Sequence, residues 1–321
     1  MVKTNTQNQI LAFIEMRGEA TVKGLAEEFS FSREMIHRHI KTLCSTNKIK
    51  KIGSAPRVFY VPAQEKETVV SVKSDIIDEN WLEILPNGEF QFGAEGFGSW
   101  CIKRNFNILE KIDEYEKIYF QKEKLKKNEL IDATNKLTKT FSQNYLEKIW
   151  YVDFYSWEIF GKTTLGKLIL HAKQNSDEIL MKRIAEKIKA PIVSLIGRGK
   201  FDMIGLIPHS VPRKKDFLET TISFLHIAPK PKKLFTKIFA QHVVAQKTLK
   251  SKEERQINAE NTLFLNEEVI PKKVLLIDDA CGSGATLNIA AQKIKQRFPK
   301  TKVYGLTFVG SMNGFDVINQ V

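Results

Sequence analysis

The chain has 321 residues, 42% of them apolar, and a formal net charge of +13. This length suffices for two domains with buried cores, and no apolar run approaches the roughly 20 residues of a membrane-spanning helix. The N-terminus lacks the apolar core of a signal peptide, so we expect a cytoplasmic protein with no membrane partner. The cysteines, Cys44, Cys101 and Cys281, lie far apart, which excludes a zinc ribbon and disfavours a disulfide framework.

The basic excess lies at the two ends of the chain. Residues 1–65 carry a net charge of +4, residues 66–150 carry −2, and residues 151–321 carry +11. A basic balance favours anionic partners such as nucleic acid or phosphates. A lysine-rich proteome would produce the same total, so the positions of the basic residues have to carry the argument.

Three short helical patterns come first along the chain. The first covers residues 5–16. Thr21 is placed to cap a second helix that ends near Phe29, and Ser32 to cap a third that continues to about Thr46. The residues expected to face the interior are Ile10, Leu11, Phe13, Ile14, Val22, Leu25, Ala26, Met35, Ile36, Ile40 and Leu43.

Two β-prone runs follow the third helix and predict a hairpin. They cover residues 50–52 and 57–61, with a Gly-Ser-Ala-Pro turn between them. The order helix, helix, turn, helix, hairpin resembles the winged helix-turn-helix domain of bacterial regulators. This resemblance covers nearly all of residues 1–65, and it implies a nucleic-acid-binding domain.

The exposed side of the third helix favours DNA as the partner. Such a helix enters the major groove with its N-terminal residues at base edges, while basic residues at the wing contact phosphates. A winged helix that contacts another protein is the alternative. One module rarely suffices for specific binding, so we expect a homodimer that contacts two half-sites. The candidate DNA-binding residues are Arg33, His37, Arg38, Lys41, Lys50, Lys51 and Arg57.

Residues 66–150 are interpreted as a linker, a β-hairpin and a helical segment. The pair Asn87-Gly88 between alternating residues predicts the hairpin, and the glycines and aromatic residues at 93–100 predict a loop. From residue 107 to about 148, apolar residues recur at roughly helical spacing, which predicts one long helix or two. Such a helix either pairs with its copy in a dimer or packs on its own chain, and the pattern does not decide between these.

A buried strand and a helix are predicted near the C-terminal end of the chain. Residues 274–277 are four consecutive apolar residues, typical of a strand buried on both faces of a parallel sheet. Asp278 and Asp279 follow, then a glycine-rich stretch, a helix to about residue 297 and a strand at 303–308. This strand-helix-strand unit predicts an α/β domain with a mainly parallel sheet, in which ligands bind at the carboxyl ends of the strands.

The residues after the buried strand are suited to a phosphorylated ribose. Glycines let backbone N–H groups turn toward a phosphate, and a helix N-terminus adds partial positive charge. Asp278 and Asp279, the candidate catalytic residues, can accept hydrogen bonds from a ribose diol, directly or through metal-bound water. The candidate phosphate-binding residues are Ala280, Cys281, Gly282, Ser283, Gly284, Ala285 and Thr286, of which Ser283 and Thr286 offer hydroxyl groups.

The segment VLLIDDACGSGAT at residues 274–286 resembles the phosphoribosyl pyrophosphate (PRPP) motif of type I phosphoribosyltransferases. The family often has Thr where this chain has Gly282. The resemblance implies that the ligand is PRPP or a related phosphoribosyl nucleotide. It also implies Mg²⁺ as a cofactor that arrives with the ligand rather than in a direct protein site.

A wider resemblance covers residues 151–321, which are similar to the ComF-type, amidophosphoribosyltransferase-like family. It is carried by residues 165–173, 202–210 and 246–258. The family's zinc ribbon is absent, and its pyrophosphate-side loop sequence is replaced by Arg-Lys-Lys-Asp-Phe at 213–217. The resemblance implies a type I phosphoribosyltransferase fold with pyrophosphate-loop residues Pro208, His209, Ser210, Arg213 and Lys214.

Two functions follow from this domain pairing. The first is a DNA-binding regulator of transcription that responds to PRPP, because purine-operon repressors of Gram-positive bacteria pair a winged helix with a phosphoribosyltransferase domain that binds PRPP without catalysis. The second is an active phosphoribosyltransferase, or an effector that modifies nucleotides or nucleic acid in stress or antiviral defence, targeted by its winged helix. The altered loop at 213–217 places catalysis in doubt and leaves binding in place.

Overall fold

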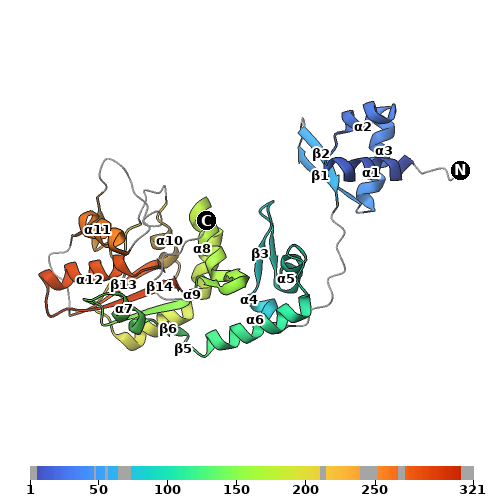
Figure 1. Cartoon of the computed structure of the whole chain (residues 1–321). Coiled ribbons are helices and arrows are strands. Elements are labelled where there is room, and N and C mark those ends of the chain that lie inside the picture. The colour runs from blue at the N-terminus through green and yellow to red at the C-terminus, as the bar shows by residue number, and fades with distance from the viewer. Residues whose placement is uncertain are drawn as a thin grey trace. The chain divides into compact units, whose positions relative to one another are not determined.

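The computed structural model describes residues 6–46, 48–54, 57–63, 74–209, 215–238, 252–266 and 272–311. The chain divides into two compact units, residues 1–71 and 72–321 (Figure 1). No helix among the described residues is both long enough and apolar enough to cross a lipid bilayer.

The first unit has the element order that its sequence predicts. Helices α1 (Thr6–Arg17), α2 (Val22–Phe29) and α3 (Arg33–Ser45) precede the antiparallel strands β1 (Ile49–Ser54) and β2 (Arg57–Pro62). Both expected caps are confirmed: the Thr21 hydroxyl accepts from the Gly24 N–H at 3.0 Å, and the Ser32 hydroxyl from the Met35 N–H at 3.2 Å. Ser30 between α2 and α3 is left-handed, with φ 54°, which turns the chain sharply between the two helices.

A small apolar core holds the first unit together. Ile10 and Ile14 of α1, Leu25 of α2, and Ile36 and Ile40 of α3 are buried. The sequence interpretation was wrong for one core position, because the side chain of Met35 is 38% exposed. Met35 precedes Ile36 by one residue, about 100° around the helix, so only one of these two neighbours can point directly inward.

The second unit is built on a six-stranded sheet. Its strand order is β10-β13-β14-β7-β6-β5. The first four strands are parallel, β6 is antiparallel to β7, and β5 is antiparallel to β6, which confirms the expected mainly parallel sheet. The strands are β5 (Lys126–Lys127), β6 (Leu130–Asp132), β7 (Lys148–Phe154), β10 (Met203–Leu206), β13 (Lys273–Cys281) and β14 (Lys302–Gly310).

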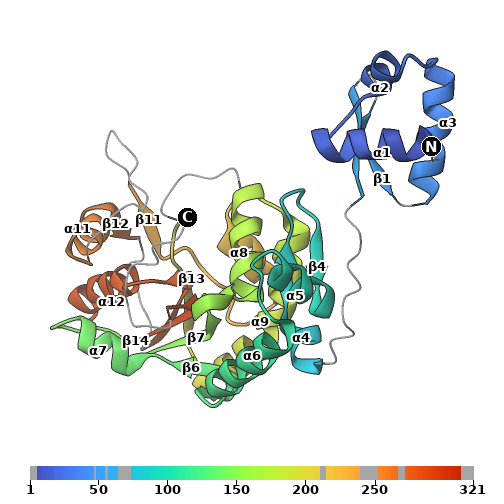
Figure 2. The same cartoon turned by 45° about the vertical axis from the view of Figure 1, so that its right-hand side comes forward.

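Helices cover both faces of this sheet, as Figure 2 shows for α12 on one side of the strands and α8 and α9 on the other. Side chains alternate along β13, so that Val274 and Leu276 join one apolar cluster while Leu275 and Ile277 join the other. All four are fully buried, which confirms a strand enclosed on both faces. The covering helices are α8 (Thr164–Asn175), α9 (Glu178–Gly199), α10 (Phe217–Ser223) and α12 (Ala285–Arg297), and α11 (Lys252–Thr262) packs against α12.

Two small two-stranded sheets complete this part of the unit. Strands β11 (Phe235–Lys237) and β12 (Leu263–Leu265) pair antiparallel. Strands β8 (Ser156–Trp157) and β9 (Gly161–Lys162) also pair antiparallel, around the short 3-10 turn Glu158–Phe160.

Residues 74–147 differ from their predicted structure in two places. The expected hairpin is present as β3 (Leu82–Ile84) and β4 (Phe90–Phe92), after helix α4 (Asp75–Asn80). The glycine-rich stretch is not a loop but helix α5 (Gly93–Ile102). The helical segment predicted over 107–148 was only partly correct, because α6 (Ile108–Glu123) ends early, β5 and β6 follow, and α7 (Thr134–Thr140) is short. These two strands extend the sheet, an interaction with distant residues that local periodicity does not report.

Close packing explains why the glycine-rich stretch forms a helix. A Cβ at Gly96 would lie 2.4 Å from the backbone oxygen of Gln91, so glycine lets α5 pack directly on the end of the hairpin. We expect Gly96→Ala to lower the free energy of unfolding by about 2–3 kcal/mol, measured by urea denaturation. Gly197→Ala is the matched control: it lies in α9 with open space around it, and it should raise stability by up to about 1 kcal/mol. Equal effects of the two substitutions would contradict this packing argument.

Candidate functional site

The paired aspartates lie where the sequence places them, at the carboxyl end of β13. The strand continues through Asp278 and Asp279 to Cys281, and its neighbour β10 ends at Leu206 on the same edge of the sheet. Because β10 and β13 are parallel, the loop after β10, which contains His209, leaves the sheet on the same side as the aspartates. His209 and the paired aspartates, which lie in two separate segments of the sequence, are therefore found at the same edge of the sheet.

The turn after β13 leads into an uncapped helix. Gly284 has φ 78°, a left-handed conformation that favours glycine, and it precedes α12 without a side-chain hydrogen bond to the helix end. The nearest side-chain acceptor, the Ser283 hydroxyl, lies 3.4 Å from the Ala285 N–H, at the limit of a hydrogen bond. N–H groups of the first turn of a helix lack intrahelical partners. This turn is thus arranged to donate hydrogen bonds to an anion.

The aspartate pair is electrostatically strained. The Asp279 N–H donates to Asp278 Oδ1 at 2.8 Å, which holds one carboxylate over the backbone of the other. Burial, and then the charge of Asp279, raise the pKa of Asp278 to about 7, against the opposing effects of Lys173 and Lys237. The ionised form of this carboxyl group is therefore disfavoured in the folded protein, and a ligand that donates hydrogen bonds to it would favour that form.

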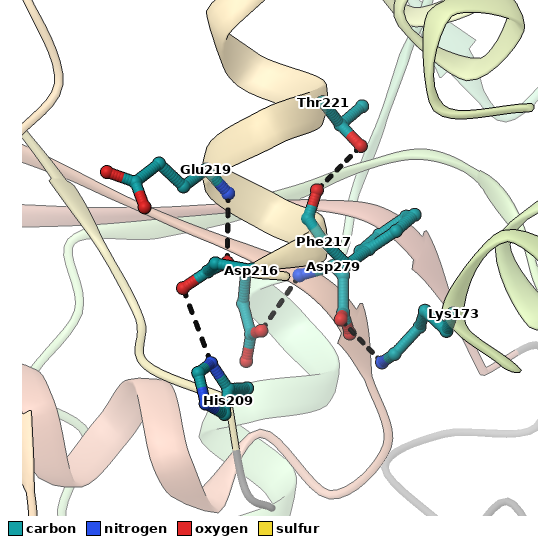
Figure 3. A network of polar contacts seen from close by, with 8 residues as sticks. Lys173, His209, Asp216, Phe217, Glu219, Thr221 and Asp279 are labelled. Atoms are coloured by element: carbon teal, nitrogen blue, oxygen red, sulfur yellow. Dashed lines mark hydrogen bonds and ion pairs between the residues drawn. The ribbon is translucent and has the colours of Figure 1, made fainter. Parts of the chain in front are cut away.

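A lysine from α8 neutralises the second aspartate. Lys173 Nζ lies 2.5 Å from Asp279 Oδ2 and 5.8 Å from the ring centroid of Phe217. Figure 3 shows Lys173 extending from its helix toward Asp279, with Phe217 beside it. The burial of Tyr155, and then the Asp279 charge, raise the pKa of the Tyr155 hydroxyl to about 12. A cation, an aromatic ring and a neutral phenol thus surround the aspartate.

His209 is held by the start of α10. Its Nδ1 lies 3.3 Å from Asp216 Oδ2, and the same aspartate caps α10 by accepting from the Glu219 N–H at 3.0 Å (Figure 3). The His209 side chain is 34% exposed, so one face of the ring remains open to solvent. This arrangement orients the imidazole at the edge of the site.

The raised pKa of Asp278 predicts how stability depends on pH. A carboxyl group whose folded-state pKa exceeds its unfolded value binds a proton in the folded protein that the unfolded chain has released, so its contribution to stability falls as pH rises from about 4 to about 7. Asp278→Asn should therefore raise the free energy of unfolding by several kcal/mol at pH 8, at about 1.4 kcal/mol for each unit of pKa difference, and by a smaller amount at pH 5. Urea denaturation at the two pH values measures this. A variant that is less stable than the parent protein at both would contradict the electrostatic argument.

The structure brings together only part of the expected pyrophosphate loop. Pro208 and His209 are half-buried at the end of β10. The expectations for Ser210, Arg213 and Lys214 lie outside the described residues. The last residues of the altered loop sequence, Asp216 and Phe217, take part in the contacts around His209 and Lys173.

Three charged residues near the aspartates were not among the predicted site residues. Lys173 lies 106 residues before Asp279 in the sequence, and its only signal was its place in the segment that resembles the ComF-type helix. Lys237 of β11 acts on Asp278 through its charge, and burial lowers the pKa of its own ammonium group. The sequence indicated Asp216 only as a member of the altered loop sequence at 213–217.

The candidate DNA-binding residues share one property. They lie on α3, β1 and β2 of the first unit, and each one whose side chain is described is exposed. The side chain of Arg57 lies outside the described residues, although its backbone pairs with Ser54 in the hairpin. The exposed residues are Arg33, His37, Arg38, Lys41, Lys50 and Lys51.

A metal ion held by protein side chains alone does not fit this edge of the sheet. Within the described parts of the chain, no group of three or more histidine, cysteine, aspartate or glutamate side chains is arranged to hold a metal. Asp278 and Asp279 supply two carboxylates, and Lys173 occupies one of them. Because Mg²⁺ usually combines one or two carboxylates with substrate phosphates and waters, these residues suit a magnesium ion that enters together with a phosphorylated ligand.

The chain combines a helix-turn-helix unit with a mixed α/β unit that has a six-stranded, mostly parallel sheet. Residues 6–60 match the family described as HTH domain, which covers α1 to β2 and favours DNA binding. No curated protein matches the chain. The assignment of the first unit therefore has independent support, and the second unit must be interpreted from its geometry.

Proposed function

We propose that this protein is a DNA-binding regulator of transcription whose α/β unit binds PRPP or a related phosphoribosyl nucleotide. The observation that carries the proposal is the junction of β13 and α12. Paired aspartates, a left-handed glycine and an uncapped helix start follow one another within the eight residues 278–285, at the edge of the sheet where α/β folds bind ligands.

Each part of this junction suits one part of the ligand. The N–H groups of the first turn of α12 and the hydroxyl of Ser283 would donate to the 5′-phosphate. Asp278 and Asp279 would accept from the two ribose hydroxyls, as charge-assisted hydrogen bonds. Lys173 would exchange its contact with Asp279 for one with a ligand oxygen, or keep the carboxylate ionised. Mg²⁺ entering with the ligand would neutralise the pyrophosphate charge.

A ligand can control DNA binding only if it binds two states of the protein with different affinity. We propose that the functional species is a homodimer that contacts two DNA half-sites through α3. The direct test is a titration of DNA by the full-length protein with and without saturating PRPP and Mg²⁺. A DNA affinity that does not change with PRPP would rule out the sensor.

An active phosphoribosyltransferase is the competing function. It would release pyrophosphate from PRPP in the presence of an acceptor base or nucleotide. A coupled assay for pyrophosphate with a panel of acceptors separates the two, because the sensor binds PRPP and does not consume it. Release with any acceptor would favour the enzyme and its targeting by the winged helix.

A further inference from the structure

A cavity of about 170 Å³ lies between α6, the start of α8 and the carboxyl end of β7. None of the residues assigned above to the phosphate site lines it. A cavity of about 150 Å³ is large enough to admit benzene. The space therefore suits a molecule of about six to ten non-hydrogen atoms.

A carboxyl group without an ion-pair partner faces this space. Asp153 of β7 lines the cavity, and its Oδ1 accepts from the Phe154 N–H at 2.7 Å. Among the described residues, no lysine or arginine nitrogen lies within 4.0 Å of its oxygens. Burial raises the pKa of Asp153 to about 6, with Lys126 and Lys187 opposing and Glu123 reinforcing the shift. A buried carboxylate that lacks a close cation is unfavourable, and a cationic group in the cavity would relieve this.

A second group in the cavity wall also lacks a partner. Trp157 is only 5% exposed, and its Nε1 is buried without a hydrogen-bond acceptor in the described structure. A buried N–H group left unpaired costs about 1–3 kcal/mol. This atom is closed to solvent as well as unpaired, so the ring serves the cavity as an aromatic wall and not as a hydrogen-bond donor.

The charges around the cavity are balanced. Lys126 pairs with Glu123 at 2.6 Å, and Lys187 is exposed on α9. Two ammonium groups therefore accompany the two carboxylates of Glu123 and Asp153 in the lining. The rings of Tyr115 and Tyr119 stand 5.2 and 6.0 Å from the Trp157 ring, centroid to centroid, and they supply an aromatic wall that attracts cations. A balanced lining disfavours both a phosphate and a simple cation.

We propose that this cavity binds a small zwitterion, namely a free α-amino acid. Its ammonium group would contact Asp153 and the aromatic wall. Its carboxylate would accept from Lys126 and Lys187. The side chain would pack against Val152 and Leu165, the apolar residues of the lining. This site is independent of the proposed PRPP site.

The test is calorimetric titration of the full-length protein with alanine, valine, leucine and proline. We expect at least one of them to bind. The matched analogues of the bound amino acid, its amide without the carboxylate and its carboxylic acid without the ammonium group, should bind at least tenfold more weakly. Inorganic phosphate and uracil, of comparable size, should not bind.

Variants then place binding in the cavity. Asp153→Asn keeps an acceptor for the Phe154 N–H and should weaken amino-acid binding at least tenfold, and Lys187→Ala, at an exposed position, should weaken it several-fold. Asp113→Asn, an exposed carboxylate on the same α6 but outside the cavity, should leave affinity unchanged. Failure of all four amino acids to bind, equal binding of the analogues, preferential binding of uracil, or full affinity in Asp153→Asn would each overturn the proposal.

Discussion

Asp278→Asn is expected to weaken PRPP binding about 100-fold and to leave DNA binding by the ligand-free protein unchanged. Hydrogen bonds to a charged group contribute about 1.5–3 kcal/mol, and 2.7 kcal/mol corresponds to a factor of about 100 in affinity. The aspartate is replaced at the carboxyl end of β13, in the second unit, whereas the candidate DNA contacts lie on α3, β1 and β2 of the first. Calorimetry with PRPP and Mg²⁺ measures the first effect, and fluorescence anisotropy with labelled DNA the second.

The same substitution distinguishes loss of function from loss of fold. Burial and the charge of Asp279 disfavour the ionised form of Asp278. The variant that no longer binds PRPP should therefore be more stable than the parent protein above neutral pH. If the main role of Asp278 were packing, the substitution would instead make the protein less stable. The exposed Asp113 on α6 supplies the control, because Asp113→Asn removes one carboxylate at a distance from β13. PRPP binding by Asp278→Asn at the parental affinity would remove the basis of the sensor proposal.

Arg38→Ala is expected to reduce specific DNA affinity by about 10- to 100-fold. A bidentate contact from arginine to guanine contributes about 1–3 kcal/mol of discrimination, and Arg38 is exposed on α3, the second helix of the helix-turn-helix pair. Because the operator sequence is not fixed by the protein sequence, the DNA probe should be selected from a random pool with the parent protein. Anisotropy titrations with that probe and with a scrambled probe separate specific from non-specific binding.

Lys23→Ala is the matched control for Arg38. Lys23 lies on α2 with 69% of its side chain exposed and pairs only loosely with Glu27, at 3.8 Å. Lys23→Ala should change the affinity for both probes by less than threefold, because Lys23 can contribute no more than a contact to a DNA phosphate. If Arg38→Ala and Lys23→Ala behave alike on the selected probe, then α3 is not the helix that contacts base edges.

The sequence predicted best those features that depend on neighbouring residues. The hydroxyl caps at Thr21 and Ser32 were correct because a cap bonds to an N–H three residues away. The strand at 274–277 was also correct, since four apolar residues before two acids leave few alternatives to burial. These features need no knowledge of the rest of the fold.

The contacts that complete the site depend on residues far apart in the sequence. Lys173 meets Asp279 across 106 residues, and neither residue carries a local signal of the other. The partial error over 107–148 has a similar origin, because β6 forms by pairing with β7 although its own three residues would suit a helix as well. Tertiary pairing overrides propensity in such short segments.

The path of β7 decides how this protein can be divided for experiment. The strand runs from Lys148 to Phe154 and pairs with β14 on one side and β6 on the other. An expression fragment that begins at residue 151 would cut this strand in two and discard both strands at that border of the sheet. Ser74 caps α4 and donates to Glu116 at 2.6 Å, so a fragment that begins there keeps the sheet and its helical cover whole.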